Sequence, residues 1–316
     1  FIMLWIAMTR AGVSLKLKRP KITPGVRRLV SLGIPGLIAG GITQINLLVS
    51  TMIASLQDSA PSWLYYADRI YQLPLGVIGI AIGVVLLPEL SRRLRADDSE
   101  GVQSSQNRAL EISMLLTVPS AVALMAMPHP IIHVLFERGA FDADDARATS
   151  IALAAFAAGL PAFVMIKVFS PAFFAREDTR TPMWFALISV VINITGALAL
   201  FPFIAYVGVA LATTAAGWVN ALLLGYTLSK RGDFALDDRM RKALPRIIGA
   251  SLVMGFALLG VMQFVSTIFS ADNLFVVRLA ALAVMVGFGA AVYFAIAWWT
   301  GALDVAALKQ SFSRKS

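Results

Sequence analysis

The stretch that decides the fold is Ser62-Trp-Leu-Tyr-Tyr-Ala-Asp-Arg-Ile-Tyr-Gln-Leu-Pro-Leu75, which continues as an apolar run to Pro88. It predicts one long helix with an acid and a base, Asp68 and Arg69, in its first third. A charge in hydrocarbon costs at least about 2.5 kcal/mol, so such residues normally face a protein-lined or watery interior. Helical spacing places Gln72 on the same face as Arg69. This face suits either a cleft for an anionic ligand or the close approach of another helix.

The composition is that of a membrane protein. Of 316 residues, 58% are hydrophobic and 14% are charged, whereas soluble domains are about 45–50% apolar and about 25% charged. Runs of about 20 apolar residues are long enough to cross a bilayer, which predicts an all-α polytopic membrane protein. Cysteine is absent, which excludes disulfides and thiol chemistry. The net charge of +9 is attributed to basic loops rather than to a nucleic-acid partner.

The chain contains eight apolar segments of spanning length, and it opens with a shorter one at residues 1–8. That opening lacks the pattern of a secretory signal and is interpreted as the tail of a helix that begins upstream. We therefore expect the chain to be an incomplete C-terminal portion of a longer protein. The predicted spans are roughly 29–56, 62–90, 109–136, 150–174, 183–201, 206–228, 247–269 and 274–299.

Basic residues fall almost entirely in alternate loops. These loops hold 22 of the 27 Lys and Arg residues, and the other set of loops holds only Arg138 and Arg147. Cytoplasmic loops of membrane proteins are enriched in Lys and Arg. The 22-residue side is therefore predicted to be cytoplasmic, together with the C-terminus.

Arg69 is the residue most strongly indicated for function. With span 62–90 entering from the outside, Arg69 lies about 10 Å along the helix. The alternative is an interfacial arginine whose stem lies beside the neighbouring tyrosines with Asp68 as its partner. Leu73–Leu87 has only 15 residues, fewer than the roughly 20 that span a bilayer, so the embedded part must include residues before Leu73. We predict that Arg69 faces a cavity and that Asp68 orients its neighbours.

Other polar residues inside the spans have weaker claims. Gln44 and Asn46 are predicted to line a polar interior, whereas the glycines of their span are interpreted as sites of close helix packing. Lys167 is either an anchor that extends to the cytoplasmic face or a residue of an inner gate. For the glycines after Arg69 two interpretations stay open: they line a cleft, or they allow another helix to pack closely. Uncharged polar residues are assigned to interhelical hydrogen bonds: Asn193, Thr195, Thr213, Thr214 and Asn220.

Catalysis and metal binding are not indicated. His129 and His133 have helical i, i+4 spacing, but Pro130 interrupts them and no third ligand is evident. Arg278, near the outer end of the last span, is interpreted as interfacial. The sequence shows no nucleophile–base pair, phosphate loop or carboxylate dyad, which predicts neither an enzyme nor a cofactor.

Six motifs carry a family resemblance: Gln44-Ile-Asn46, Trp63–Arg69, Leu73–Gly76, Leu87-Pro88, Phe136–Phe141 and Lys167–Pro182. Together they resemble the MurJ (MviN) family of bacterial lipid II flippases, part of the superfamily of multidrug, oligosaccharide-lipid and polysaccharide exporters. The resemblance covers nearly the whole chain. It implies fourteen helices, arranged as two six-helix lobes around a central cavity, with two further C-terminal helices.

By this resemblance the chain divides into three parts. Residues 1–28 are the end of a preceding helix and a basic cytoplasmic loop, 29–228 the second six-helix lobe, and 229–316 a charged loop, two extra helices and a cytoplasmic tail. The implied function is movement of lipid II from the inner to the outer leaflet of the cytoplasmic membrane by alternating access. The implied partners are lipid II, membrane lipids and an N-terminal lobe that is missing here.

The resemblance also implies roles for residues. Arg69 matches the second lobe's essential arginine, which receives the pyrophosphate and sugar head group, and the two extra helices form a groove for the polyprenyl tail. Gln72 stands where some relatives carry a carboxylate. Because spans 29–56, 183–201 and 206–228 lack a carboxylate in their middle, the sequence does not support a cation site of the kind suggested for some relatives. The coupling ion or potential stays open.

The alternatives are a multidrug/cation antiporter or a polysaccharide-lipid exporter of the same superfamily. Cavity charge discriminates, because a pyrophosphate ligand requires several Arg or Lys whereas a cationic drug requires buried Asp or Glu. This chain offers Arg69 and Lys167 against Asp68. A non-transporting scaffold would need no buried arginine.

Overall fold

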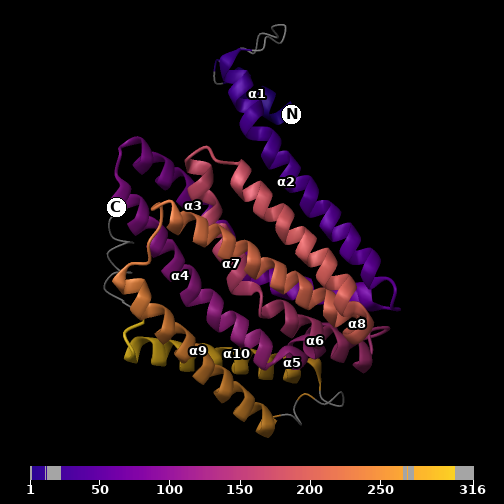
Figure 1. The fold of residues 1–316 in the computed structure, drawn as a ribbon. Coiled ribbons are helices and arrows are strands. Elements are labelled where there is room, and N and C mark those ends of the chain that lie inside the picture. The colour runs from indigo at the N-terminus through magenta and orange to yellow at the C-terminus, as the bar shows by residue number, and fades with distance from the viewer. Residues whose placement is uncertain (1, 11, 13–22, 266–268, 270–273, 303–316) are drawn as a thin grey trace.

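The computed structural model describes residues 2–10, 12, 23–265, 269 and 274–302 (Figure 1). Most of the predicted basic loop after residue 12 and the C-terminal tail from residue 303 therefore lie outside the described residues. Within the described ranges the structure is helical and contains no β-strand. The helices are α1 (Ile2–Arg10), α2 (Pro24–Ala54), α3 (Ala60–Arg95), α4 (Ser99–Ala126), α5 (Pro128–Phe136), α6 (Ala143–Ala157), α7 (Leu160–Ala175), α8 (Arg180–Lys230), α9 (Asp238–Val265) and α10 (Phe275–Trp299).

Seven helical segments in the described residues are long and apolar enough to cross a membrane, counting α6 and α7 together. The predicted all-α polytopic class is thus confirmed, but the predicted number of eight separate spans is not. Spans 183–201 and 206–228 fall within α8, which is interrupted after Pro202 by non-helical backbone at Ile204 and Ala205. Gly208 lies so close to Leu200 that a Cβ there would be 2.8 Å from the Leu200 Cβ. The two halves of α8 therefore fold back on each other at this point.

Two predicted spans are divided by breaks. Span 109–136 separates into α4 and α5 at Met127, whose φ of −132° and ψ of 48° lie outside the helical region. Pro128 follows directly, and a residue before proline avoids the helical conformation. Span 150–174 separates into α6 and α7 at residues 158–159.

The break between α6 and α7 is held by side chains of α8. Thr214 Oγ1 donates to the carbonyl of Ala155 at 2.7 Å, and Trp218 Nε1 donates to the carbonyl of Ala158 at 3.0 Å. Carbonyls at a helix end have no intrahelical partner and need one from elsewhere. Donors one turn apart on α8 meet this need, so the break is a fixed feature of the packing.

A hydrogen bond at a proline also links α10 to α4. Pro119 has no N–H, so the carbonyl of Leu115, four residues earlier, lacks its helical donor. Tyr293 of α10 donates its hydroxyl to that carbonyl at 2.7 Å, and the tyrosine is only 1% exposed. This buried bond fixes the C-terminal helix pair against the kinked part of α4.

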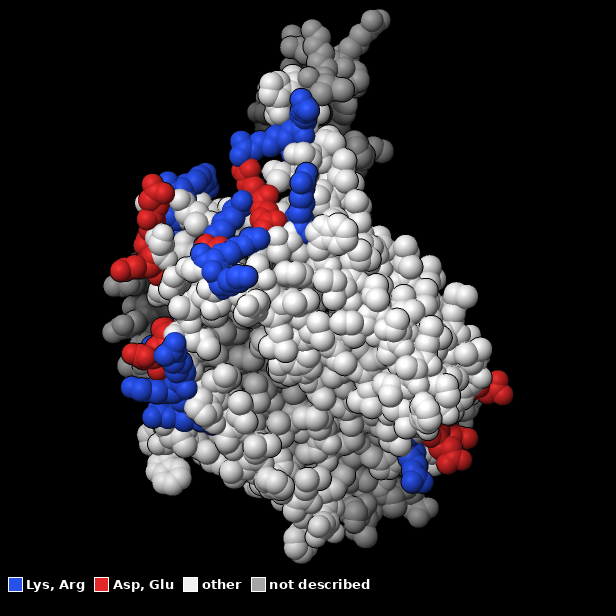
Figure 2. Space-filling model, in the orientation of Figure 1, with Lys and Arg blue, Asp and Glu red and all other residues white. Residues whose placement is uncertain are grey.

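The helices form one bundle with α2 on one side and α9 and α10 on the other (Figure 1). The α2 helix packs along α8 and meets α3 only slightly. Much of its other face is exposed and apolar, as at Leu37, which is 77% exposed. On the face in Figure 2, charged side chains gather toward the edges and a broad uncharged area lies between them. That distribution fits contact with lipid along the sides of the bundle.

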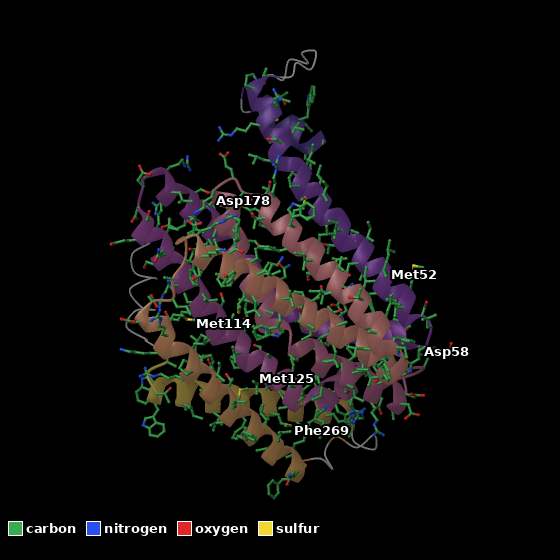
Figure 3. The ribbon with its side chains drawn as sticks, viewed as in Figure 1. Met52, Asp58, Met114, Met125, Asp178 and Phe269 are labelled. Carbon is green, nitrogen blue, oxygen red and sulfur yellow. The ribbon has the colours of Figure 1, made fainter. Side chains whose placement is uncertain are left out.

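Loops far apart in sequence meet at one end of the bundle. Arg28 pairs with Glu177 at 2.6 Å, and Arg231 pairs with Asp178 at 2.7 Å. Figure 3 labels Asp178 at this end and Asp58 at the opposite end. The loops that the charge count assigned to one side of the membrane therefore lie together.

The turn between α7 and α8 is organised by Asp178. Its carboxylate accepts the Thr181 amide at 3.0 Å, the Thr181 hydroxyl at 2.7 Å and the Arg231 guanidinium at 2.7 Å. Partial burial alone would raise the pKa of Asp178, but these hydrogen bonds and the ion pair outweigh burial and hold the pKa below its usual value. A lowered folded-state pKa stabilises the turn above the unfolded pKa of about 3.9, and the contribution is lost as pH falls through the folded value.

Replacing Asp178 with asparagine is expected to speed amide exchange at Thr181 about two- to fivefold near neutral pH. The estimate takes about 0.5–1 kcal/mol for a charged hydrogen-bond set that solvent partly screens. Hydrogen exchange followed by mass spectrometry measures it, with Asp58→Asn, an exposed residue at the other end, as control. The difference from wild type should shrink once pH falls below about 4, and a difference that grew there would contradict this role.

Candidate functional site

A cavity of about 750 Å³ lies among α2, α3, α6 and α8. Polar side chains from α2 and α3 make up much of its lining, and Phe156, Val209 and Thr213 complete it from α6 and α8. Five of the six predicted site residues come together in this one cavity: Gln44, Asn46, Asp68, Arg69 and Gln72.

Arg69 presents a positive charge to this cavity. Its guanidinium carbon lies 4.6 Å from the centre of the Tyr65 ring, a cation–π contact that orients the side chain. Its residue is exposed, and among the described residues it forms no ion pair, including none with Asp68. An arginine keeps its charge under all physiological conditions. Its five N–H donors are therefore available to an anionic ligand.

Asp68 is engaged by a neighbour on its own helix. The Gln72 side-chain amide, one turn later, donates to the Asp68 carboxylate. Asp68 is half-buried and Gln72 is exposed. This bond uses one of about four lone-pair positions of the carboxylate, and the orienting role of Asp68 stays a prediction.

Lys167 lies in an adjoining cavity of about 500 Å³, which shares Thr43, Asp68 and Gln72 with the first. Its stem runs over Gly79, where a Cβ would be 3.6 Å from the Lys167 Cγ, whereas Gly76 has open space. Gly76 therefore leaves open space beneath Arg69, whereas Gly79 is buried and contacts the Lys167 stem of α7. Lys167 is exposed and borders this cavity, and its role as an anchor or as part of an inner gate stays a prediction.

The predicted packing at the α2 glycines does not occur among the described residues. At Gly33, Gly36 and Gly40 an added Cβ would have no atom within 4 Å among the described residues. The reason is that α2 uses one face for α8 and leaves these glycines on its open side.

A buried asparagine that the sequence did not mark as part of the site supports the α2 wall of the cavity. Asn193 of α8 is 1% exposed. Its Nδ2 donates to Asn46 Oδ1 at 2.8 Å and to Ser50 Oγ at 3.2 Å. Thr213 Oγ1 donates to its Oδ1 at 3.2 Å. The interhelical bonds predicted for Asn193 and Thr214 are confirmed, whereas Thr195 bonds the Val191 carbonyl of its own helix.

His133 is occupied on both ring nitrogens. Nδ1 lies 2.5 Å from Glu137 Oε2, and Nε2 lies 3.0 Å from an Arg278 nitrogen. A guanidinium only donates, so Nε2 accepts the hydrogen bond from Arg278. Nδ1 therefore carries the hydrogen and donates the hydrogen bond to Glu137. The sequence predicts an interfacial position for Arg278; the structure instead bonds it to His133 of α5. In the part of the chain that the structure describes, no cluster of three metal-binding side chains occurs.

A cavity with many polar side chains and an arginine that forms no ion pair among the described residues, bordered by apolar helices of spanning length, is typical of multi-pass membrane transporters. Comparison with known proteins gives the family. A family model described as "Lipid II flippase MurJ" matches residues 1–280. The "Probable lipid II flippase MurJ" of Rhizobium meliloti is 46% identical over 310 residues, which cover 98% of this chain and 58% of that protein. This chain belongs to the MurJ family of lipid II flippases.

Other relatives and solved structures agree. The protein of the same description from Vibrio cholerae is 36% identical over 290 residues, covering 92% of this chain and 55% of that protein. A solved lipid II flippase MurJ in an inward closed conformation has a TM-score of 0.69 at 26% identity, covering 94% of this chain and 59% of that chain. A MATE structure in the bent conformation, with a TM-score of 0.55 at 19% identity over 78% of this chain and 59% of that one, shows likeness of fold alone.

These matches settle three expectations. The family is one of transporters, so the prediction that the chain is not an enzyme is confirmed. The apolar helices and the family also confirm a multi-pass protein of the bacterial inner membrane. The expectation of an incomplete C-terminal portion is corrected to the extent of the match itself: the family model covers residues 1–280, and the Rhizobium meliloti alignment covers 98% of this chain. The chain spans 58% of that relative's length.

Proposed function

We propose that this chain acts in moving lipid II from the inner to the outer leaflet of the cytoplasmic membrane. The observation that carries the proposal is the placement of Arg69 in the polar cavity of a lipid II flippase family member. A pyrophosphate attracts guanidinium and ammonium groups through short, charge-assisted hydrogen bonds. Arg69 is assigned to bind the pyrophosphate and head group. Lys167 is assigned a supporting role from the adjoining cavity. The residues assigned to the polar lining of the Arg69 cavity are Gln44, Asn46, Asp68 and Gln72.

We further propose a lobed arrangement. Residues 29–228, from α2 to α8, act as one six-helix lobe of a two-lobed exporter, and residues 229–316 contribute two additional helices. Residues 1–28 lead into the lobe. The open side of the Arg69 cavity faces the other lobe, and alternating access of the cavity moves the head group. The end that carries Arg28 and Asp178 is assigned to the cytoplasm on its excess of basic residues, and the C-terminus is assigned to the same side.

A drug/cation antiporter or a polysaccharide-lipid exporter of the same superfamily is the second candidate. The MATE-like fold is its main support. Cavity charge favours the flippase, since Arg69 and Lys167 bring two positive charges to the two adjoining cavities against the one carboxylate of Asp68. No cofactor is proposed, and the coupling ion or potential stays unassigned.

Photo-cross-linking tests this function. A photoreactive residue at Gln44, in the cavity, is expected to capture radiolabelled lipid II in membranes. The matched control carries the same residue at Leu37, on the exposed face of the same helix. Equal labelling at both positions would indicate nonspecific contact with a membrane lipid and would contradict the proposal.

A further inference from the structure

A second cavity, of about 590 Å³, has no part in the function proposed above. It lies between the start of α3 and the segment that joins α5 to α6. Ser59 places it at the end of the bundle where Figure 3 labels Asp58. Its lining includes Trp63, Phe136, Arg138, Phe141 and Asp145, and it shares Ser62 and Tyr66 with the Arg69 cavity.

One wall of this cavity is aromatic. The Tyr66 ring lies 4.9 Å from the Phe136 ring and 5.2 Å from the Phe141 ring, and the two phenylalanine rings are 6.3 Å apart. These centroid separations are those of rings packed on one another. The three rings therefore form a continuous apolar wall, not a cage that surrounds a cation.

The chain between α5 and α6 is shaped to complete this wall. Gly139 has a φ of +65°, a conformation that glycine adopts without steric cost. The turn is closed by the Phe141 amide, which donates to the Arg138 carbonyl at 3.2 Å. This turn returns Phe141 to the side of Phe136. The motif Phe136–Phe141 is thereby explained by the cavity rather than by the Arg69 site.

The rim supplies a fixed acceptor and a free donor. Asp145 accepts the Trp63 indole N–H at 2.6 Å and the Asp142 amide at 3.3 Å, and a carboxylate has about four lone-pair positions, so acceptor capacity remains. Arg138 is exposed and forms no ion pair among the described residues. Its guanidinium carbon lies 6.0 Å from the Phe275 ring centre.

We propose that this cavity binds a sugar ring. A pyranose has an apolar C–H face that stacks on aromatic rings and a rim of hydroxyls that both donate and accept hydrogen bonds. The aromatic wall, Asp145 and Arg138 match these features one by one. The positive charge of Arg138 disfavours a cationic ligand, and the negative charge of Asp145 disfavours an anionic one. The volume lies in the range of about 300–1,000 Å³ that small-ligand sites occupy.

The sugar can come from a lipid-linked precursor or from free glycan. Only the lipid-linked source rests on the proposed function, because Ser62 and Tyr66 border both cavities and would let one head group reach from the first to the second. Binding by the cavity itself depends on its own lining.

The test uses the purified chain in nanodiscs with diacetylchitobiose, a soluble disaccharide of N-acetylglucosamine. Saturation-transfer NMR should show saturable binding, with transfer to the C–H protons of the sugar. Phe141→Ala and Arg138→Ala should each weaken binding about fivefold, as expected for one aromatic or charged contact. Arg147→Ala, a nearby exposed arginine that does not line the cavity, should leave binding unchanged.

Further binding measurements distinguish the two sources of the sugar, and they distinguish a failure of the sugar site from a failure of the proposed function. Arg69→Ala tests the proposed function separately and should weaken lipid II binding. If Phe141→Ala weakens binding of both ligands, the cavity is a subsite for the lipid-linked sugar; if it weakens the disaccharide alone, the cavity takes free glycan. Absence of saturable disaccharide binding, or binding that neither Phe141→Ala nor the surface variant Arg138→Ala changes, would overturn the sugar site. An unchanged lipid II affinity in Arg69→Ala would instead count against the proposed function.

Discussion

Arg69→Ala is expected to abolish growth of cells whose only lipid II flippase carries this chain, without lowering the amount of protein in the membrane. The variant removes the unpaired cation of the cavity, and charge-assisted hydrogen bonds contribute about 1.5–3 kcal/mol each. The loss corresponds to about a tenfold to 150-fold weaker hold on the pyrophosphate. Folding should be unaffected, because Arg69 is exposed and its one described ring partner is Tyr65.

Two control variants sharpen this prediction. Arg69→Lys keeps the charge but loses the bidentate fork and the stacking on Tyr65, so partial growth is expected. Arg147→Ala removes an exposed arginine outside the cavity and should leave growth normal. Complementation assays with immunoblots of membrane fractions measure both quantities. Normal growth of Arg69→Ala would exclude an essential role for the cavity cation.

Asn193→Leu is expected to loosen α2 from the bundle. The substitution removes the two hydrogen bonds that Asn193 Nδ2 donates to α2, to Asn46 Oδ1 at 2.8 Å and to Ser50 Oγ at 3.2 Å. The net contribution of each bond is about 0.5–1.5 kcal/mol, about 1–3 kcal/mol for the two. The effect should concentrate in α2, because α2 packs mainly on α8.

Hydrogen exchange over residues 43–51 measures this effect, with about a fivefold to 100-fold increase expected from that free energy. Thr195→Val is the matched control on the same helix, because Thr195 is exposed and bonds a carbonyl of its own helix. Cross-linking of lipid II at Gln44 should fall together with the loosening. Unchanged exchange in Asn193→Leu would mean that apolar packing alone holds α2.

The composition of the cavity could be predicted because polar residues are rare in the apolar spans. Helical spacing grouped Arg69 with Gln72, and the structure places both in one cavity with Gln44 and Asn46. The prediction that Arg69 faces a cavity follows from its position before a stretch too short to span. These inferences need only one helix at a time.

Features that depend on two helices could not be predicted from one stretch of sequence. The break between α6 and α7 is stabilised by Thr214 and Trp218, more than 50 residues away. The contact between the Lys167 stem and Gly79 joins two helices, α7 and α3. The role of Asn193 in the α2 wall depends on which face of α8 meets α2. A lone polar residue in a span signals a partner but does not identify it.

The most direct measurement is the amount of lipid II that reaches the outer leaflet. An enzyme that cleaves lipid II, added outside cells that depend on this chain, reports that amount by the release of labelled head group. If Arg69 holds the head group in the cavity, wild-type cells release label, and Arg69→Ala cells release about tenfold less while their total lipid II rises. Equal release from both strains at equal protein levels would contradict a head-group site at Arg69.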